Sequence, residues 1–485
     1  MNPSSCSSSS TVASDSLLRE IDASARPPLF ALFFSGAIWL VISSIFGLIA
    51  SIKLHLPDLF ANCAWLTYGR VYPAATNALL YGFAIPAGLG VGLWIIARLG
   101  QTRVVQPWII AFGAKIWNLG VLVGIFGILN GDSTGFESLE MPKYAAILLF
   151  MAYTVIGIWT LLTLHARREK TLTAPQWFLL AALFWFPWIF STAHLLLTVW
   201  PVRGVTQAIV AWWFAANLKF VWLALVGLAA SFYFISQLMK RALHSQYLAL
   251  FTFWTLVLFA AWSGIPHSAP VPAWMPAIST VATVLTLITI LTVMVNVYRT
   301  VGRGCGQAEN PAPGKFIAFG IMAFVVSWGM HIVNAVPELA SFTQFTWFNV
   351  AQNHLNVYGF FAMTLFGAIY YIMPRVMGVE CPCWGRVKAH YWLALFGIIL
   401  IVIPLAVGGV VQGIKLNHPQ VAFVEVMKSG LNFVRATSLG EVLLLVGHLL
   451  LLANLIGLAL RHARTRVTPV FVDVMTEIKP AGVKS

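Results

Sequence analysis

Twelve long apolar runs constrain this chain more than any other feature of its sequence. A helix needs about 20 mostly apolar residues to cross the hydrocarbon layer of a bilayer. Such runs fill nearly the whole chain, at roughly 29–51, 73–99, 105–128, 143–165, 177–200, 206–237, 246–266, 272–298, 316–337, 346–373, 391–413 and 436–460. Because 59% of the 485 residues are hydrophobic and only 9% are charged, the sequence predicts an all-α polytopic membrane protein, a twelve-transmembrane-helix bundle.

The predicted spans leave no room for a separate soluble domain. Residues 29–461 are expected to form one transmembrane domain. Residues 1–28 begin with a serine-rich run and have no apolar core, so we predict a disordered polar tail and not a secretory signal. Residues 462–485 are predicted to form a second polar tail.

Lysine and arginine are distributed unevenly between the loops. If the N-terminus is cytoplasmic, that side carries 20 of the 29 basic residues and the other side 7, with Lys115 and Lys219 inside spans. Basic residues collect in the cytoplasmic loops of membrane proteins. The sequence therefore predicts that both termini are cytoplasmic. The net charge of +14 then reflects membrane topology and gives no reason to expect nucleic acid as a partner.

The five cysteines give no disulfide framework. Cys381 and Cys383 form a C-P-C motif in a basic loop, which is a weak pattern for a metal site. A reduced loop is the preferred interpretation, and the role of the two thiols stays open.

Several ionisable side chains lie inside predicted spans, where a charge is costly and marks a candidate functional position. They are Lys115, His194, Lys219, His331, His354, Glu441 and His448. Histidines in a helical bundle also serve as hydrogen-bond partners between helices. Glu441 and His448 are seven residues apart and share a helix face. They could relay protons or fill polar gaps between helices, and the second interpretation is preferred.

The stretch FNVAQNHLNVYGFF, residues 348–361, places polar residues deep in the tenth span. Gln352 and His354 are two residues apart, a rotation of about 200° on a helix, so they point to opposite sides. Two ligands at this spacing can serve two separate cofactors, and imidazole is the usual haem ligand in redox proteins.

Four stretches, in order, resemble a known family. FTWFNVAQNHLNVYGFFAMTLFGAIYYIMPRVMG (345–378) resembles the tenth helix of subunit I of the haem–copper oxidases, and looks most like the cbb3-type cytochrome c oxidases. LTYGRVYPAATNALLYGF (66–83) resembles the start of the second helix, WWFAANLKF (212–220) the sixth-helix copper motif, and WSGIPHS (262–268) the end of the seventh helix. The resemblance covers the whole membrane portion of the chain.

The resemblance implies a function in a respiratory chain, in the bacterial cytoplasmic (inner) membrane. In this family a low-spin haem b passes electrons to a high-spin haem that faces a copper ion, where oxygen is reduced and protons are pumped. Electrons arrive from c-type cytochrome subunits, so these or other respiratory-complex subunits are the expected partners. Six histidines hold the metals.

Most of those six histidines are replaced in this chain. The second-helix ligand aligns with Ala75, a copper ligand with Ala216 and the high-spin haem ligand with Gln352. His267 is the remnant of a His-His copper pair, and only His354 stands unchanged at a haem position. A methyl group cannot bind iron or copper. We therefore expect one haem b at most, with His354 as its candidate ligand, and no copper.

Lys219 is three residues beyond Ala216 and is expected on the same helix face. This spacing predicts a buried positive charge near the former copper position. A buried cation there could replace part of the charge of the missing metal, which is the preferred interpretation. It could also bind an anion, stay neutral, or extend along the helix toward the membrane surface.

Three functions stay open. The first is a redox protein with one haem b, whose second ligand would come from His194, His331 or His448. The second is a non-catalytic assembly, accessory or electron-input subunit. The third is a channel or transporter that uses Lys115, Lys219 and Glu441 as a polar path. Haem and metal content would separate the first from the other two.

Overall fold

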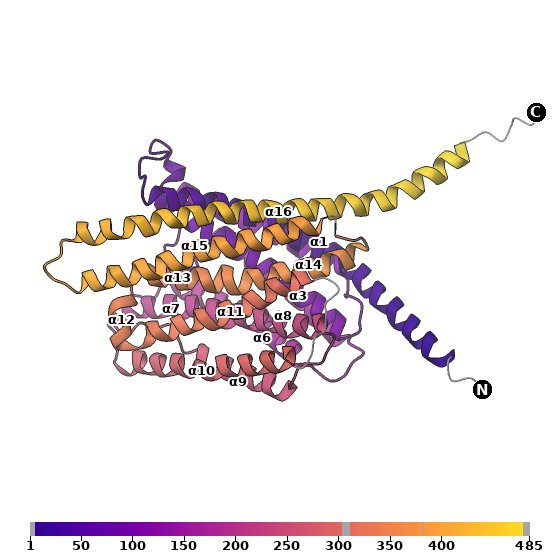
Figure 1. Ribbon diagram of the computed structural model, residues 1–485, viewed down its shortest axis with the longest axis horizontal. Helices are drawn as coiled ribbons and strands as arrows, with labels where there is room; N and C mark the ends of the chain where they lie inside the picture. The colour runs from indigo at the N-terminus through magenta and orange to yellow at the C-terminus, as the bar shows by residue number, and fades with distance from the viewer. Residues whose placement is uncertain (1–4, 303–310, 382, 479–485) are drawn as a thin grey trace, which may run out of the picture.

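The regular structure of the chain is entirely helical wherever it is described. The computed structural model describes residues 5–302, 311–381 and 383–478, with side chains for 16–302, 312–381 and 383–465, and contains no strand in these ranges. Long helices lie side by side and form one bundle (Figure 1).

The helices follow one another with short connections. In chain order they are α1 (Ser5–Lys53), the short η1 (Ala64–Leu66), α2 (Tyr68–Asn77), η2 (Ala78–Ala84), α3 (Ile85–Leu99), α4 (Pro107–Asn130), α5 (Lys143–His165), α6 (Ala174–His194), η3 (Leu195–Val199), α7 (Val205–Ala216), η4 (Asn217–Trp222), α8 (Leu223–Leu238), α9 (Gln246–Ala260), α10 (Trp274–Val301), α11 (Pro311–Ala335), α12 (Pro337–Thr343), α13 (Trp347–His354), η5 (Leu355–Ala362), α14 (Met363–Met377), α15 (Trp384–Leu416) and α16 (Phe423–Ile478). Within the described ranges, eleven helical rods are long and apolar enough to cross a membrane. With the 15-residue α9 as a shorter twelfth rod, the predicted twelve-helix membrane bundle is confirmed.

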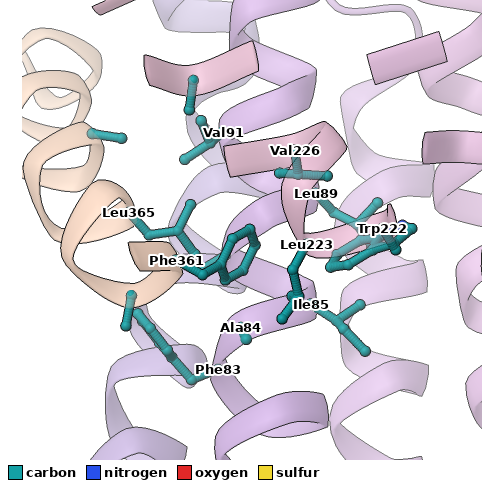
Figure 2. Packing of buried hydrophobic residues seen from close by; sticks show 14 of the residues in the cluster. Phe83, Ala84, Ile85, Leu89, Val91, Trp222, Leu223, Val226, Phe361 and Leu365 are labelled. Atoms are coloured by element: carbon teal, nitrogen blue, oxygen red, sulfur yellow. The ribbon is translucent and has the colours of Figure 1, made fainter. Parts of the chain in front are cut away.

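Three rods form the centre of the bundle. They are α2–η2–α3 (68–99), α7–η4–α8 (205–238) and α13–η5–α14 (347–377), whose apolar windows are 94–100% buried, against 39–56% for the other rods. Figure 2 shows residues of these rods packed against one another, including Trp222 and Phe361. Gly88 makes this close packing possible, since a Cβ there would lie 3.2 Å from atoms of both Val226 and Phe361. The three central rods carry three of the four motifs found in the sequence.

Each central rod contains a π-helical segment. η2, η4 and η5 are π-helices that begin directly after Asn77, Ala216 and His354. Such segments occur often at functional sites, because the wider turn re-aims the side chains on either side of it. The backbone geometry around the expected ligand positions is thus irregular in all three rods, although most of the ligands are replaced.

The described residues of the two predicted polar tails, 1–28 and 462–485, are helical. α1 extends back to Ser5 and α16 extends to Ile478. Asp22, inside the predicted 1–28 tail, is buried, accepts a hydrogen bond from the Trp94 indole at 2.9 Å and pairs with Arg98 at 3.3 Å. At Asp22, therefore, a polar residue of this segment serves a buried contact with the bundle. α1 and α16 project from the same end of the bundle (Figure 1), as an even number of spans requires.

Candidate functional site

A cavity of about 140 Å³ lies between the central rods and the outer helices α1, α15 and α16. His354, Ala75 and Glu441 all line it. Its other walls include Leu54 and Tyr68, which lie next to the end of α1 and the start of α2. Because α1 begins at the opposite end of the bundle, the cavity lies toward the face away from the two chain ends (Figure 1).

His354 presents one ring nitrogen to this cavity. Its Nδ1 lies 3.0 Å from the carbonyl oxygen of Val350, so the ring proton is assigned to Nδ1, and Nε2 keeps its lone pair. Metal-ligating histidines are commonly oriented by such a bond from the other nitrogen. Nε2 lies 3.9 Å from Oε1 of Glu441, whose side chain is only 8% exposed. A buried carboxyl group, and not a second imidazole, thus stands opposite His354.

Ala75 leaves the α2 wall of the cavity without a ligand. Its side chain is buried, and its carbonyl oxygen accepts a hydrogen bond from Ser43 Oγ at 2.8 Å. A methyl group offers no lone pair to a metal. His354 is therefore the one histidine among the described residues that line the cavity.

Gln352, on the opposite side of α13, lies in a closely packed part of the bundle. It is 4% exposed, and its amide donates to the carbonyl oxygen of Ser327 on α11 at 3.4 Å. Beside Ser327, Trp328 packs edge-on against Phe220 of η4, and Phe220 stacks on His331 with the ring centroids 3.7 Å apart. Aromatic side chains thus occupy the space between α11 and η4, next to Gln352.

Ala216 lies in close contact with the loop that follows α9. A Cβ added to Gly264 would overlap the Cβ of Ala216, so the loop backbone fits only against a small side chain. His267, three residues further along, is exposed. In the described ranges, no group of three or more His, Cys, Asp or Glu side chains could hold a metal ion.

Lys219 belongs to the wall of the cavity and has a partner that the sequence did not suggest. Its ammonium group pairs with the carboxylate of Glu137 and donates to Asn353 Oδ1 at 3.4 Å. The Glu137 side chain is 60% exposed, and Glu137 lines the cavity. The positive charge of Lys219 lowers the pKa of Glu137, and the hydrogen bond between them acts in the same direction. Lys219 is buried, as predicted, and its charge is balanced by the carboxylate of Glu137.

Glu140 brings a third carboxyl group to the cavity. It accepts a hydrogen bond from Asn77 Nδ2 at 2.9 Å. Burial nevertheless raises the pKa of Glu140 to about 7, and the Asn77 bond only partly offsets this. The cavity is therefore lined by three carboxyl groups and one ammonium group.

The remaining candidates lie elsewhere. Lys115 is exposed on the outer surface of α4, so the expectation that it faces the bundle interior is wrong. The three other histidines proposed as a second ligand do not line the cavity, so none of them supplies a ligand to it: His194, His331 and His448.

Cys381 is buried and Cys383 is partly buried. Pro382 lies outside the described residues.

Sequence reasoning missed three residues of interest. Glu137 and Glu140 fall in the loop between α4 and α5, and the only available signal was two carboxyl groups three residues apart in a chain with just 15 acidic residues. His390 was missed because the predicted span began at residue 391. It is fully buried in α15.

Comparison with known proteins agrees with this architecture. A polytopic bundle whose central helices carry these motif positions is the class of subunit I of the haem–copper oxidases. The chain belongs to the family described as cytochrome c and quinol oxidase polypeptide I, whose model matches residues 28–443.

Individual relatives are distant but nearly full-length. The chain is 23% identical over 386 residues to the cbb3-type cytochrome c oxidase subunit CcoN1 of Stutzerimonas stutzeri, covering 78% of this chain and 81% of that protein. It is 23% identical over 455 residues to a bacteroid cytochrome c oxidase subunit 1 homolog of Bradyrhizobium diazoefficiens, covering 87% and 80%. A cytochrome c oxidase subunit 1 homolog of Agrobacterium tumefaciens is 24% identical over 464 residues, covering 88% and 82%.

Proposed function

We propose that this chain is a divergent, cbb3-like subunit I of a respiratory-chain complex that lacks a complete haem–copper centre and does not itself reduce oxygen. The observation that carries the proposal is the packing at Ala216 and Gln352. The methyl group of Ala216 contacts a loop backbone, and Gln352 lies next to a region filled by aromatic rings. Neither position offers the donors or the space for a high-spin haem facing copper.

The low-spin haem position keeps half of its donor set. His354 has the ring orientation of a ligand, and a haem b held there would supply one-electron transfer. Ala75 cannot complete six-coordination, and three carboxyl groups against one ammonium group make a poor environment for the anionic propionates of a haem. The residues therefore do not fit a six-coordinate haem b. The second candidate function, a single-haem electron carrier, rests on the His354 geometry alone.

The same proposal includes the membrane orientation of the chain and its partner subunits. The 20-to-7 distribution of basic residues supports an orientation with both chain ends in the cytoplasm, in the inner membrane of a bacterium. A chain without its own oxygen site would act as an accessory, assembly or electron-input subunit. Its partners would then be c-type cytochrome subunits or other subunits of a respiratory complex.

Quantifying haem, iron and copper in the protein purified in mild detergent tests the proposal. We expect no copper, no oxygen consumption with reduced cytochrome c, and at most one haem. Two haems and one copper per chain would overturn the proposal. One b-type haem that disappears in His354→Ala but persists in His194→Ala would select the electron carrier, since His194 does not line the cavity. The absence of haem would select the non-catalytic subunit.

A further inference from the structure

A chain of buried polar side chains runs through the bundle between two cavities. We call it the relay chain. It consists of Tyr358, Ser44, His448, His390 and Tyr370, which come from η5, α1, α16, α15 and α14. Four of its five residues have no more than 2% of their surface exposed, and Tyr358 has 6%. Neither His354 nor Glu441 belongs to it.

The relay chain begins at the cavity described above. Tyr358 lines that cavity, and its hydroxyl group faces those of Ser43 and Ser44. Ser44 Oγ lies 2.6 Å from Nδ1 of His448, a short hydrogen bond. The ring of Tyr358 stacks on the same imidazole with the centroids 6.0 Å apart. The first three residues thus form one continuous contact.

The middle of the relay chain is a pair of histidines. The ring centroids of His448 and His390 lie 6.2 Å apart, nearly perpendicular to each other. The Nε2 atoms of both rings are fully buried and have no hydrogen-bond partner. Buried polar atoms in proteins are nearly always paired, and an unpaired one most often marks a water molecule or an ion. The two unpaired nitrogens belong to adjacent rings, and a proton path through both rings requires a water molecule that contacts both nitrogens.

The relay chain ends at a second cavity. Nδ1 of His390 lies 3.0 Å from the hydroxyl oxygen of Tyr370. The amide of Asn454 also donates to that hydroxyl oxygen, at 3.4 Å, and its own Oδ1 is buried without a partner. Tyr370 lines a cavity of about 750 Å³ together with Arg375 and Cys381. Because these two residues lie at and just beyond the end of α14, this cavity opens on the face from which α1 and α16 project (Figure 1).

From this arrangement we propose that the relay chain is a proton path across the membrane. A proton that binds one imidazole nitrogen is matched by a proton that leaves the other nitrogen of the same ring. Each histidine therefore ends the transfer with its original number of protons and with its tautomer exchanged. The hydroxyl groups of Ser44, Tyr358 and Tyr370 donate one proton as they accept another. One bound water between the two Nε2 atoms closes the gap in the middle.

An unpaired ring nitrogen alone does not identify a relay, since Nε2 of His194 and Nε2 of His331 are also buried without a partner. The proposal rests on the order of the contacts, in which Nδ1 of His448 and Nδ1 of His390 each have a hydroxyl partner and the two rings lie next to each other. The proposal is also independent of whether a haem occupies the first cavity, so its failure would leave the proposed lack of a haem–copper centre untouched, and that is decided by metal content.

Proton flux into vesicles tests the proposal. The purified full-length protein is reconstituted into liposomes that contain a pH-sensitive dye, and valinomycin with a potassium gradient drives protons inward. We expect the vesicles to acidify faster than protein-free vesicles. Replacing either central histidine, His448→Gln or His390→Gln, should lower the rate to that of protein-free vesicles, because an amide can hydrogen-bond but cannot carry a proton. His194→Gln, a buried histidine outside the relay chain, should keep the wild-type rate.

Any of three results would overturn the proposal. The first is a wild-type rate equal to that of protein-free vesicles. The second is an unchanged rate in well-folded His448→Gln and His390→Gln proteins, even if they melt at a lower temperature, since a structural role moves stability alone. If either histidine variant fails to insert, Tyr370→Phe decides the matter, because it removes one hydroxyl group from the end of the relay chain. Retained flux in that variant would overturn the proposal as well.

Discussion

The two sides of α13 have different surroundings. His354, on one side, faces an open cavity bordered by carboxyl groups. Gln352, on the other side, donates to a backbone carbonyl next to a region filled by aromatic rings. The two positions are only two residues apart on one helix, so the difference cannot come from their depth in the membrane. It comes from what the neighbouring rods present to each side.

This difference concerns how tightly the neighbouring elements pack against each side. Around Gln352 and Ala216 the neighbouring helices and loops pack closely, and apolar packing stabilises that part of the interior. Around His354 the cavity stays open, and polar side chains line the space. A closed site cannot be restored by adding back one ligand, whereas an open site accepts a larger side chain.

The largest expected effect follows from enlarging a side chain on the closed side. Ala216→His would force an imidazole into the backbone turn at Gly264, where even a Cβ on the glycine would overlap the alanine methyl group. Overpacking of this kind costs about 3 kcal/mol. We expect a clear drop in the apparent Tm of the detergent-solubilised protein, measured by tryptophan fluorescence. An unchanged Tm would mean that this part of the interior is not closed.

The second effect concerns the ion pair on the open side. Lys219→Met leaves the Glu137 carboxylate without its partner, which destabilises a fully buried pair by several kcal/mol. Because Glu137 faces the cavity and can be hydrated, we expect a smaller loss of about 2 kcal/mol. The double variant Lys219→Met/Glu137→Gln should recover part of this loss in a double-mutant cycle. Additive effects of the two substitutions would show that the pair is not coupled.

Hydropathy predicted the number of spans but not all of their ends. The seventh span was expected to reach residue 266, yet α9 ends at Ala260. Gly264 has a φ of +102°, and Pro266 follows it, so the backbone turns away from the helix. Composition also predicted a tail at 1–28, because sequence alone cannot show that Asp22 finds Trp94 and Arg98 in the third dimension.

The candidate site could be predicted only in part. The alignment of motifs located Ala75, Gln352 and His354 on central helices, and the rotation of about 200° between the last two agrees with their different surroundings. Lys219 lies in the π-helical η4, where the wider turn changes which residues share a face, and it lines the cavity whereas Ala216 does not. Its partner Glu137 is 82 residues away, a pairing that no local pattern reveals.

The third prediction enlarges a side chain on the open side. Ala75→His places an imidazole in the cavity, so we expect less than about 1 kcal/mol of destabilisation, in contrast to Ala216→His. With two imidazoles lining the same cavity, the variant should also bind more b-type haem per chain than the unmodified protein. The Soret absorbance relative to the protein absorbance measures this gain. The double variant Ala75→His/His354→Ala is the control, and equal haem in both variants would contradict a role for His354.

The smallest expected effect is a pH dependence that comes from Glu140. Burial raises the pKa of this carboxyl group to about 7, whereas in the unfolded chain it has its ordinary value. Between those two values the unfolded state releases the proton and the folded state keeps it, so Glu140 lowers the stability as the pH rises through that window.

Glu140→Gln removes this contribution. Glu137, whose pKa is lowered, acts at more acidic pH and is present in both proteins, so it cancels in the comparison. Between pH 5 and pH 8 the apparent Tm of the unmodified protein should therefore fall by about 1 °C more than that of the variant. Parallel Tm curves would mean that water enters the cavity freely enough to give Glu140 its ordinary pKa, and the open side would then be a solvated inlet and not a buried pocket.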